Sequence, residues 1–389
     1  MIDKILLFPY YLVLAIRHGL YNKGFICKSV EAEVPTICLG NITAGGTGKT
    51  PHAEMILRAL QRSDDWAFRN VAILSRGYKR ESKGFQQLPL DATTAFYGDE
   101  PVQIKRKFPA VTVAVDRDRI EGCRYLCHPD TILPGKKGEY CQAKEFPPAD
   151  LIVLDDAFQY RKLKATYNIV LIDYNRPVNK DRLIPFGRLR DLPRRIRAAQ
   201  AIIITKCPHY MEDSDKAAFL EAMGYRDYDP VLCQAVIGRR GLVQKVFFTC
   251  INYQPMTNIY PEGDLRYIYS QKLILFSGIA KDMPLRMFLS DKYKIIKRFS
   301  FNDHHKFTHT DIRAFVKASK ANPTAALATT EKDACRLQDY SSVPPRLKER
   351  LFQIPIETAF LSDNEESVFV ASLLAGVRDK LTDNSNVQQ

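Results

Sequence analysis

Residues 40–51 form a glycine-rich stretch that follows the apolar run at 36–39 and ends in Gly48, Lys49 and Thr50. A strand that leads into such a loop and then into a helix directs backbone N–H groups and the positive end of the helix dipole at one point, where a polyphosphate binds. In loops of this kind the lysine reaches the β and γ phosphates, and the hydroxyl that follows coordinates Mg²⁺. The spacing predicts a nucleoside triphosphate site with Thr50 as a metal ligand and a cradle made of Thr43, Ala44, Gly45, Gly46, Thr47, Gly48, Lys49 and Thr50.

The loop departs from the usual phosphate-binding pattern at one position. Counting back from Gly48, Thr43 stands where the first glycine of G-x-x-x-x-G-K-[ST] belongs. The flanks fit nevertheless, because an apolar strand precedes the loop and residues 51–60 have the periodicity of an amphipathic helix. The alternative is an ordinary glycine-rich turn between a strand and a helix.

A second apolar run, at residues 151–154, ends in Asp155 and Asp156. A strand followed by an acidic residue holds the magnesium ion in P-loop enzymes. Adjacent strand residues point to opposite faces of the sheet, so we assign Asp155 to the metal and Asp156 to the acceptor substrate. The alternative is a turn at the end of a strand.

Two other segments contain candidate catalytic groups. Asp99 and Glu100 fit the start of a helix, where a cap with a first-turn acid is the local interpretation. His304 follows Asp303 after a strand, and a histidine beside an aspartate can orient or relay a proton as a general base. For His304 and His305 the alternative is a solvated loop.

Short apolar runs alternate with helical stretches through the first half of the chain. They lie at residues 36–40, 71–74, 111–115, 151–154, 168–172 and 201–204. Such runs are typical of buried parallel strands, and their alternation with helices predicts a doubly wound, mostly parallel α/β sheet. Ligands of this fold class bind beyond the carboxyl ends of the strands.

The pattern changes near residue 250 and predicts a second, smaller α/β domain. Two strand-like segments, 246–249 and 352–356, flank it and could pair as a two-stranded hinge. We expect residues 1–24 to form an N-terminal helix, residues 25–250 a P-loop domain to which residues 358–381 return, and residues 251–357 the smaller domain.

Charge and hydrophobicity narrow the possible partners. The chain of 389 residues has a formal net charge of +13, with eight Lys or Arg against two acids between residues 176 and 197. This excess predicts an anionic partner, and the chain lacks the interleaved aromatics or basic recognition helix that would indicate nucleic acid. The apolar run at residues 5–16 is shorter than the roughly 20 residues that span a bilayer. We expect a monotopic helix at a membrane interface, with a core helix as the alternative.

These segments together resemble the tetraacyldisaccharide 4'-kinase family of lipid A biosynthesis, within the P-loop NTPase superfamily. The family has Ser or Thr at the position of Thr43, so the irregular loop is part of the resemblance. Three positions depart from the family pattern, with Ala157 in place of glycine, Tyr160 in place of histidine and Asp191 in place of glutamate. The matching segments keep family order and are residues 40–51, 75–78, 98–101, 118–119, 154–160, 185–191, 276–280, 303–305 and 330–334.

The resemblance implies a kinase that uses ATP and Mg²⁺ to phosphorylate the 4'-hydroxyl of tetraacyldisaccharide 1-phosphate, a lipid A precursor. It implies that Asp156 pairs with His304 from the second domain and accepts the hydroxyl proton once the hinge closes. Lys49 and Asp99 join them as catalytic residues. The further residues that it implies are Thr50, Asp155 and Asp191 as metal ligands and Arg76, Arg119 and Arg190 as substrate contacts.

The same resemblance implies a location and a set of partners. We expect a peripheral protein on the anionic surface of the bacterial inner membrane, at its cytoplasmic face, with no nucleic acid and no obligate protein partner. The rival function is a P-loop ATPase that acts as a switch or energiser for a membrane partner. Such a protein would hydrolyse ATP without any sugar-lipid acceptor.

Overall fold

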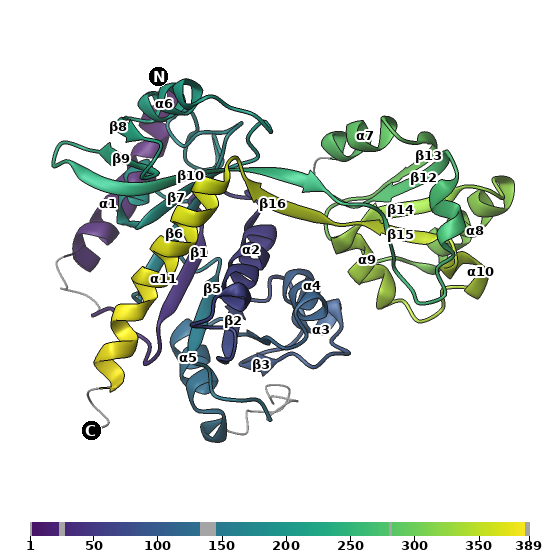
Figure 1. The fold of residues 1–389 in the computed structure, drawn as a ribbon, viewed down its shortest axis with the longest axis horizontal. Helices are drawn as coiled ribbons and strands as arrows, with labels where there is room; N and C mark the ends of the chain where they lie inside the picture. Colours follow the sequence, from purple (N-terminus) through teal and green to yellow (C-terminus); the bar gives the residue numbers. More distant parts are fainter. Residues whose placement is uncertain (1, 23–27, 133–144, 280–281, 386–389) are drawn as a thin grey trace.

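The computed structural model describes residues 2–22, 28–132, 145–279 and 282–385, and it contains two sheets of unequal size (Figure 1). From β4 to β10 the strands of the larger sheet are parallel to their neighbours. The outer strands β3, β9, β8 and β16 are antiparallel. In spatial order the larger sheet is β3 (Gln86–Gln87), β4 (Thr112–Val115), β2 (Val71–Ser75), β5 (Leu151–Asp155), β1 (Thr36–Gly40), β6 (Tyr167–Asp173), β7 (Ala201–Thr205), β10 (Leu242–Tyr253), β9 (Gln234–Ile237) and β8 (Tyr225–Asp229), with β16 (Ile356–Phe360) also paired to β10.

Both faces of the larger sheet are covered, because its central strands are apolar on both sides. Every residue of β1, β2, β5 and β7 is buried. One core contains apolar residues of α2 (Lys49–Arg62), α4 (Asp99–Lys107) and α11 (Asp363–Ser385). The other core contains residues of α5 (Arg119–Cys127) and α6 (Asp213–Ala222). The predicted doubly wound, mostly parallel sheet is confirmed.

The second sheet is the centre of the smaller lobe. Its order is β11 (Thr257–Asn258), β15 (Leu351–Ile354), β14 (Ala326–Thr330), β12 (Lys272–Ser277) and β13 (Lys294–Ser300), and only β11 is antiparallel. Helix α7 (Met283–Ser290) packs on one core of this sheet. The other core takes residues of α8 (His309–Ala321), α9 (Glu331–Gln338) and α10 (Pro345–Lys348). The remaining short elements are α3 (Thr94–Tyr97) and the 3-10 helices at Pro129–Thr131, Pro193–Ala198 and Leu265–Tyr269.

Two strands cross between the lobes. β10 leaves the larger sheet and pairs antiparallel with the returning β16, from Thr249 opposite Phe360 to Tyr253 opposite Ile356 (Figure 1). The predicted hinge segment 352–356 is corrected, because residues up to Ile354 belong to β15 of the smaller sheet. Pro355 interrupts the extended run, since proline has no N–H to donate to a sheet, and its carbonyl accepts a bond from the Gln254 N–H at 2.8 Å. The exact domain limits that we predicted stay a prediction.

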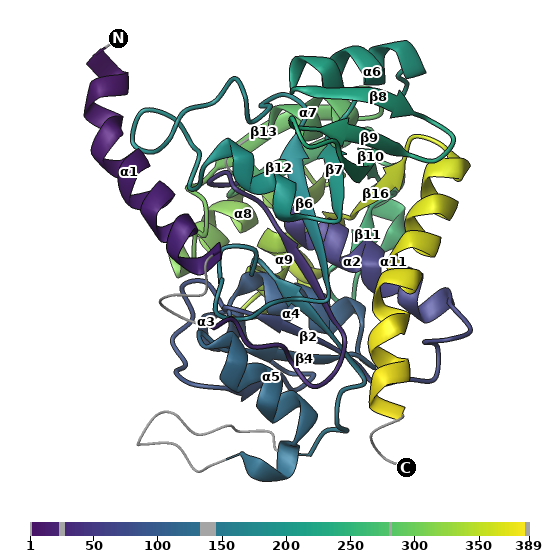
Figure 2. The same cartoon turned by 90° about the vertical axis from the view of Figure 1, so that its left-hand side faces the viewer.

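Helix α1 (Ile2–Asn22) lies against the side of the larger domain (Figure 2). Leu14 and His18, one turn apart, are buried against the domain. Phe8, Val13 and Ile16 are more than half exposed. Within the described residues, no helix is long and apolar enough to cross a membrane.

Candidate functional site

The glycine-rich loop between β1 and α2 has the backbone geometry that its sequence predicts. Gly45, Gly46 and Gly48 have φ values of 83°, 39° and 83°, in the left-handed region that a side chain disfavours. α2 begins at Lys49 directly after Gly48. The free N–H groups of the first turn of α2 therefore point out of the loop, where a phosphate is attracted by hydrogen bonding and by the helix dipole.

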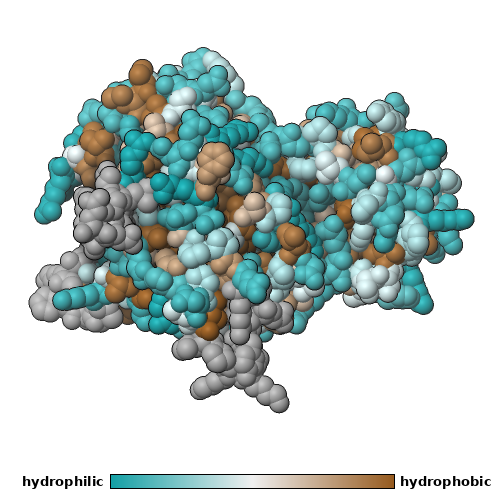
Figure 3. Space-filling model, turned by 60° about the horizontal axis from the view of Figure 1, so that its bottom comes forward, coloured by the Kyte–Doolittle hydropathy of each residue, from teal (hydrophilic) through white to brown (hydrophobic). Residues whose placement is uncertain are grey.

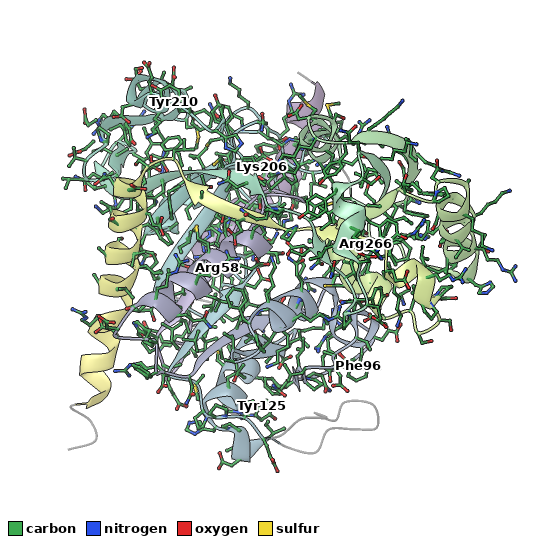
Figure 4. All side chains as sticks on the ribbon, turned by 45° about the vertical axis from the view of Figure 1, so that its right-hand side comes forward. Arg58, Phe96, Tyr125, Lys206, Tyr210 and Arg266 are labelled. Carbon is green, nitrogen blue, oxygen red and sulfur yellow. The ribbon has the colours of Figure 1, made fainter. Side chains whose placement is uncertain are left out.

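Polar contacts hold this loop from the side of β6 and β7. The Asn41 amide donates to Thr47 Oγ1 at 2.6 Å, and Thr205 Oγ1 donates to the Thr47 carbonyl at 3.1 Å. Lys206 donates to the Gly46 carbonyl and pairs with Asp173 at 2.7 Å. Lys206 lies near the centre of the molecule in Figure 4. These side chains fix the shape of the loop through its carbonyls and hydroxyl, while the Ala44 N–H donates to the Arg188 carbonyl at 2.6 Å.

The start of α2 is also bonded to both hinge strands. His52 Nδ1 lies 2.7 Å from the Gly48 carbonyl, and His52 Nε2 lies 2.9 Å from Thr249 Oγ1 of β10. Burial lowers the pKa of His52 to about 4, so the ring is neutral at pH 7. From β16, Thr358 Oγ1 donates to the Pro51 carbonyl at 3.3 Å.

The two aspartates after β5 have different surroundings. Asp155 is buried, and its Oδ2 accepts a bond from Ser75 Oγ at 3.1 Å. Asp156 has a left-handed backbone with φ of 48°. Its Oδ1 lies 3.6 Å from Lys49 Nζ and 3.4 Å from Arg190 Nη2. Asp156 therefore turns toward the phosphate loop and the loop that carries Arg190.

The residues around Asp155 fit a magnesium ion. Asp155 Oδ1 is buried and has no hydrogen-bond partner among the described residues. Burial, with the nearby charge of Glu100, raises the pKa of Asp155, which is the environment that a cation would relieve. No cluster of three His, Cys, Asp or Glu side chains occurs in the described ranges. Magnesium sites in nucleotide-binding proteins need only one or two carboxylates, with a hydroxyl such as that of Thr50, phosphate oxygens and water.

The acids at the start of α4 make contacts across the domain interface. α4 begins at Asp99, and no side chain caps the helix, so neither acid performs the capping role of the local interpretation. Asp99 Oδ2 lies 2.8 Å from Nδ1 of His304. Glu100 pairs with Lys332 at 2.7 Å, and the Lys332 charge lowers the pKa of Glu100. Both carboxylates therefore face residues of the second domain.

His304 occupies a defined position and not the solvated loop that was its alternative. Its backbone is left-handed, with φ of 65°, and its ring centroid lies 5.6 Å from that of Tyr78. Among the described residues, no hydrogen bond or ion pair joins His304 to Asp156. The predicted pairing of these two residues depends on closure of the hinge and stays a prediction, and the carboxylate within hydrogen-bonding distance of His304 is that of Asp99.

The three predicted substrate arginines differ in accessibility. Arg76 is exposed after β2. Arg190 is half-buried, and its Nη2 donates to Asn41 Oδ1 at 2.6 Å. Arg119 is buried, and its guanidinium donates to the backbone carbonyls of Asp116 and Asp155. The geometry therefore favours a supporting role for Arg119 behind the end of β5 and leaves Arg76 and Arg190 as candidates for direct contact.

Asp191 is buried where α1 meets the larger domain. Its Oδ1 lies 2.5 Å from Nε2 of His18, and Nδ1 of His18 lies 2.7 Å from Arg161 Nη1. Because a guanidinium only donates, His18 Nδ1 accepts and Nε2–H donates to Asp191. Burial lowers the pKa of His18, in agreement with this neutral form. The predicted metal-binding role of Asp191 stays a prediction, and its carboxylate contacts His18 of α1 and accepts the Leu192 N–H at 2.7 Å.

The two other departures from the family pattern have clear environments. Ala157 is buried in a core of the larger sheet. The Tyr160 hydroxyl donates to Asp118 Oδ1 at 2.8 Å, and Asp118 caps the N-terminus of α5. Among the described residues, neither side chain forms a hydrogen bond or an ion pair with Lys49 or Asp155.

The sequence did not identify Glu100, Lys332 or Arg336 as members of the site. Glu100 lies close enough to Lys49 and His304 that both charges lower its pKa, after the larger contribution of Lys332. Arg336 donates to Asp99 from α9. Lys332 and Glu100 lie within segments of the resemblance. A local sequence pattern cannot show that a residue contacts a partner more than two hundred positions away.

Comparisons with known proteins agree on one family. The sequence model of tetraacyldisaccharide-1-P 4'-kinase matches residues 4–375. Curated proteins named tetraacyldisaccharide 4'-kinase include one from Phocaeicola vulgatus, 37% identical over 377 residues that cover 95% of this chain and 93% of the relative. Another, from Parabacteroides distasonis, is 36% identical over 371 residues, or 93% of this chain and 91% of the relative.

A solved structure has the same fold. The crystal structure of LpxK from Aquifex aeolicus in complex with ATP superposes with a TM-score of 0.67 at 25% sequence identity, covering 95% of this chain and 98% of that chain. The likeness includes both sheets, because nearly all of each chain is covered. From its phosphate loop to its second domain, this chain belongs to the tetraacyldisaccharide-1-P 4'-kinase family.

Proposed function

We propose that this protein transfers the γ-phosphoryl group of ATP to the 4'-hydroxyl of tetraacyldisaccharide 1-phosphate, in lipid A biosynthesis. The observation that carries the proposal is that α4 packs both on α2, which follows the phosphate loop, and on α9 of the second domain. At the start of α4, Asp99 lies 2.8 Å from His304 and Glu100 lies 2.7 Å from Lys332. A phosphate donor and a proton acceptor thus meet at one interface, as phosphoryl transfer requires.

Each described residue of the site has a part in this transfer. Lys49 would bind the β and γ phosphates, and the Thr50 hydroxyl and Asp155 would hold Mg²⁺, which when bound would supply charge stabilisation for the transferred group. Asp156 and Arg190, 3.4 Å apart, lie next to Lys49 and orient the acceptor sugar. Family membership and the geometry of the loop support this assignment.

We assign the base role to His304, oriented by Asp99. With Nδ1–H donating to Asp99, the Nε2 atom of His304 is left as an acceptor. As the new bond forms between phosphorus and the 4'-oxygen, the bond from phosphorus to the ADP oxygen breaks and Nε2 takes the hydroxyl proton. This assignment differs from the expected pairing of His304 with Asp156, which stays a prediction for the closed form of the hinge.

The transfer is tested by following phosphorylated product from labelled ATP, with and without the tetraacyl disaccharide. Lys49→Ala should abolish transfer, whereas Arg62→Ala, which changes an exposed cation of the same helix, should leave it unchanged. Equal transfer by the Lys49→Ala protein would contradict the proposal. ATP hydrolysis that never depends on the lipid acceptor would support the rival ATPase.

The protein alone is expected to be sufficient for this reaction. Purified chain, free of other proteins and of nucleic acid, should phosphorylate the acceptor in mixed micelles. A requirement for a second protein would overturn the expectation that no obligate partner exists.

We also propose that the protein binds the cytoplasmic face of the inner membrane through α1 and the loop from residue 175 to residue 188. α1 presents Phe8, Leu12, Val13 and Ile16 to solvent. The Tyr10 hydroxyl of α1 lies 3.4 Å from the Arg190 carbonyl at the end of that loop, and Figure 2 allows the reader to follow both segments along the same side. Because α1 and this loop lie side by side, they support the proposal of one continuous membrane-binding surface.

The loop combines apolar and cationic side chains, as a surface that meets anionic lipid does. Ile184 and Phe186 are exposed. Arg176, Lys180 and Arg188 line an open cavity of about 480 Å³ and form no ion pair with any described residue. These unpaired cations are available to phosphate headgroups.

Flotation with vesicles that contain phosphatidylglycerol tests the membrane surface. At about 1 M salt, where attraction to the anionic headgroups is screened, replacing Val13 and Ile16 together by glutamate should release the protein from the vesicles. Phe68→Glu, at an almost fully exposed phenylalanine outside α1, should not. If the double variant still floats with the vesicles, α1 is a helix of the domain surface and the proposal fails.

A further inference from the structure

Arg336 of α9 is buried between the two domains with its guanidinium against Asp99. Its side chain is 3% exposed. Nε and Nη2 both donate to Asp99 Oδ2, at 2.8 and 2.6 Å. The same oxygen accepts the bond from His304 Nδ1 at 2.8 Å. One carboxylate oxygen from the first domain therefore holds two side chains from the second.

The guanidinium is itself held in place from the second domain. Arg336 Nη1 donates to Asp333 Oδ1 at 2.8 Å. Asp333 is fully buried and accepts bonds through its other oxygen, Oδ2, from Thr330 Oγ1 at 2.7 Å and the Gly278 N–H at 3.0 Å. A planar guanidinium fixed at one edge presents its remaining donors in a set direction, so Arg336 reaches Asp99 with little freedom.

Contacts away from Asp99 also join the two lobes. Arg106 of α4 donates to Gln338 Oε1 at 2.6 Å and to Asp339 Oδ1 at 3.2 Å. Asp339 also accepts bonds from the Thr94 N–H and hydroxyl at 2.5 and 2.6 Å. These contacts join the same faces of the two domains without touching Asp99, and they provide a matched control.

We propose that Arg336 is a positioning residue for phosphoryl transfer, which fixes the Asp99 carboxylate so that it orients the His304 ring toward the acceptor hydroxyl. The inference rests on the proposed kinase function. Without Arg336, the Asp99 carboxylate can rotate, and Nδ1 of His304 loses a fixed acceptor. Because Arg336 and Asp99 come from different domains, the oriented base exists only while the lobes are in contact.

Kinetics of Arg336→Ala, Arg336→Lys and Arg106→Ala test the inference. A misplacement of about 1 Å costs roughly 100-fold in rate, so we expect kcat to fall about 10- to 100-fold in both Arg336 variants. KM for ATP should stay within about twofold, since the phosphate loop is untouched. Lysine should not restore the rate, because it cannot donate the paired bonds of a guanidinium. Arg106→Ala should keep kcat within about threefold.

Chemical rescue separates positioning from loss of folding. Methylguanidinium added to the Arg336→Ala protein should restore part of kcat, and it should not affect the Arg106→Ala protein. If Arg336→Ala does not fold, as judged by its thermal midpoint, the comparison of Arg336→Lys with the wild type decides the matter. Arg336 variants that lose no more kcat than Arg106→Ala overturn the inference.

The activity of the wild-type protein distinguishes failure of the positioning role from failure of the proposed kinase function. If the wild-type chain transfers phosphate to the lipid acceptor but the Arg336 variants match the control, only the positioning role is wrong. If the wild type does not transfer phosphate at all, the proposed function itself fails.

Discussion

Three of the six non-glycine residues with a left-handed backbone in the described part of the chain lie at or beside the proposed site. Asp156, Lys206 and His304 have φ values of 48°, 59° and 65° without being glycine. Such conformations cost about 1–3 kcal/mol each, although aspartate and histidine tolerate them better than branched residues do. Ion pairs hold each of the three, through Lys49, Asp173 and Asp99 respectively. These ion pairs offset the conformational cost at positions where a side chain turns away from the end of a strand.

A buried carboxylate at position 116 should make stability depend on pH. Asp116 Oδ1 accepts the Asp118 N–H at 3.0 Å, and Oδ2 is buried without a partner among the described residues. Burial raises the pKa of Asp116 to about 6, against about 3.9 in an unfolded chain. The folded state then binds more protons than the unfolded state between about pH 4 and pH 6, so stability falls as pH rises through that window.

Removing the Asp116 carboxylate should stabilise the folded protein most at neutral pH. We compare the thermal midpoint of Asp116→Asn with that of the wild type at pH 4 and at pH 7. The difference in favour of the variant should be larger at pH 7, by an amount equivalent to about 1–3 kcal/mol of unfolding free energy. Differential scanning calorimetry at the two pH values measures the change. An identical difference at both pH values would show that Asp116 does not titrate in this range.

Among the elements, the central strands were predictable and the contacts between lobes were not. β1, β5 and β7 are buried on both faces, and that burial requires unbroken apolar runs that anyone can read in the sequence. The predicted hinge segment was a few residues away from the observed one, because Pro355 divides two strands that have similar composition. The acids that start α4 looked like a helix cap because their partners, such as His304, lie in the other domain.

The bond between α2 and β10 should stabilise the hinge. Thr249→Val removes the hydroxyl partner of His52 Nε2, 2.9 Å away, while it keeps the shape of the side chain. A buried polar group left unpaired costs about 1–3 kcal/mol, so the thermal midpoint should drop by several degrees. Thr257→Val, at an exposed position of β11, is the control. A midpoint that falls no further than that of the control would mean that His52 finds another partner.

At the scale of the whole molecule, a large positive charge is combined with exposed hydrophobic groups. The net charge is +13, and on the face shown in Figure 3 the surface is largely hydrophilic with separate hydrophobic groups. Attraction to an anionic surface acts over about 10 Å at 0.1 M salt and about 3 Å at 1 M salt. Apolar insertion of α1 is not screened by salt.

Membrane binding should therefore have two components that respond differently to salt. Raising salt from about 0.1 M to about 1 M should reduce binding to anionic vesicles by about tenfold or more, while a remainder persists. In the Val13 and Ile16 double glutamate variant, no remainder should persist at high salt. Co-sedimentation over a salt series measures both. Binding that does not change with salt would exclude an electrostatic contribution.

The pairing of β10 with β16 also makes the smaller lobe an insertion within a hairpin. Tyr253 and Ile356 are opposite one another in the ladder, so the chain departs and returns at adjacent points of the same sheet. A tight turn that joins these two positions would restore a continuous hairpin, and the excised lobe keeps its own sheet and cores. The truncated protein would retain Lys49 and Asp155 but lose His304 and Arg336. On the proposed assignment of residues, the truncated protein would bind the nucleotide but would not transfer its phosphate.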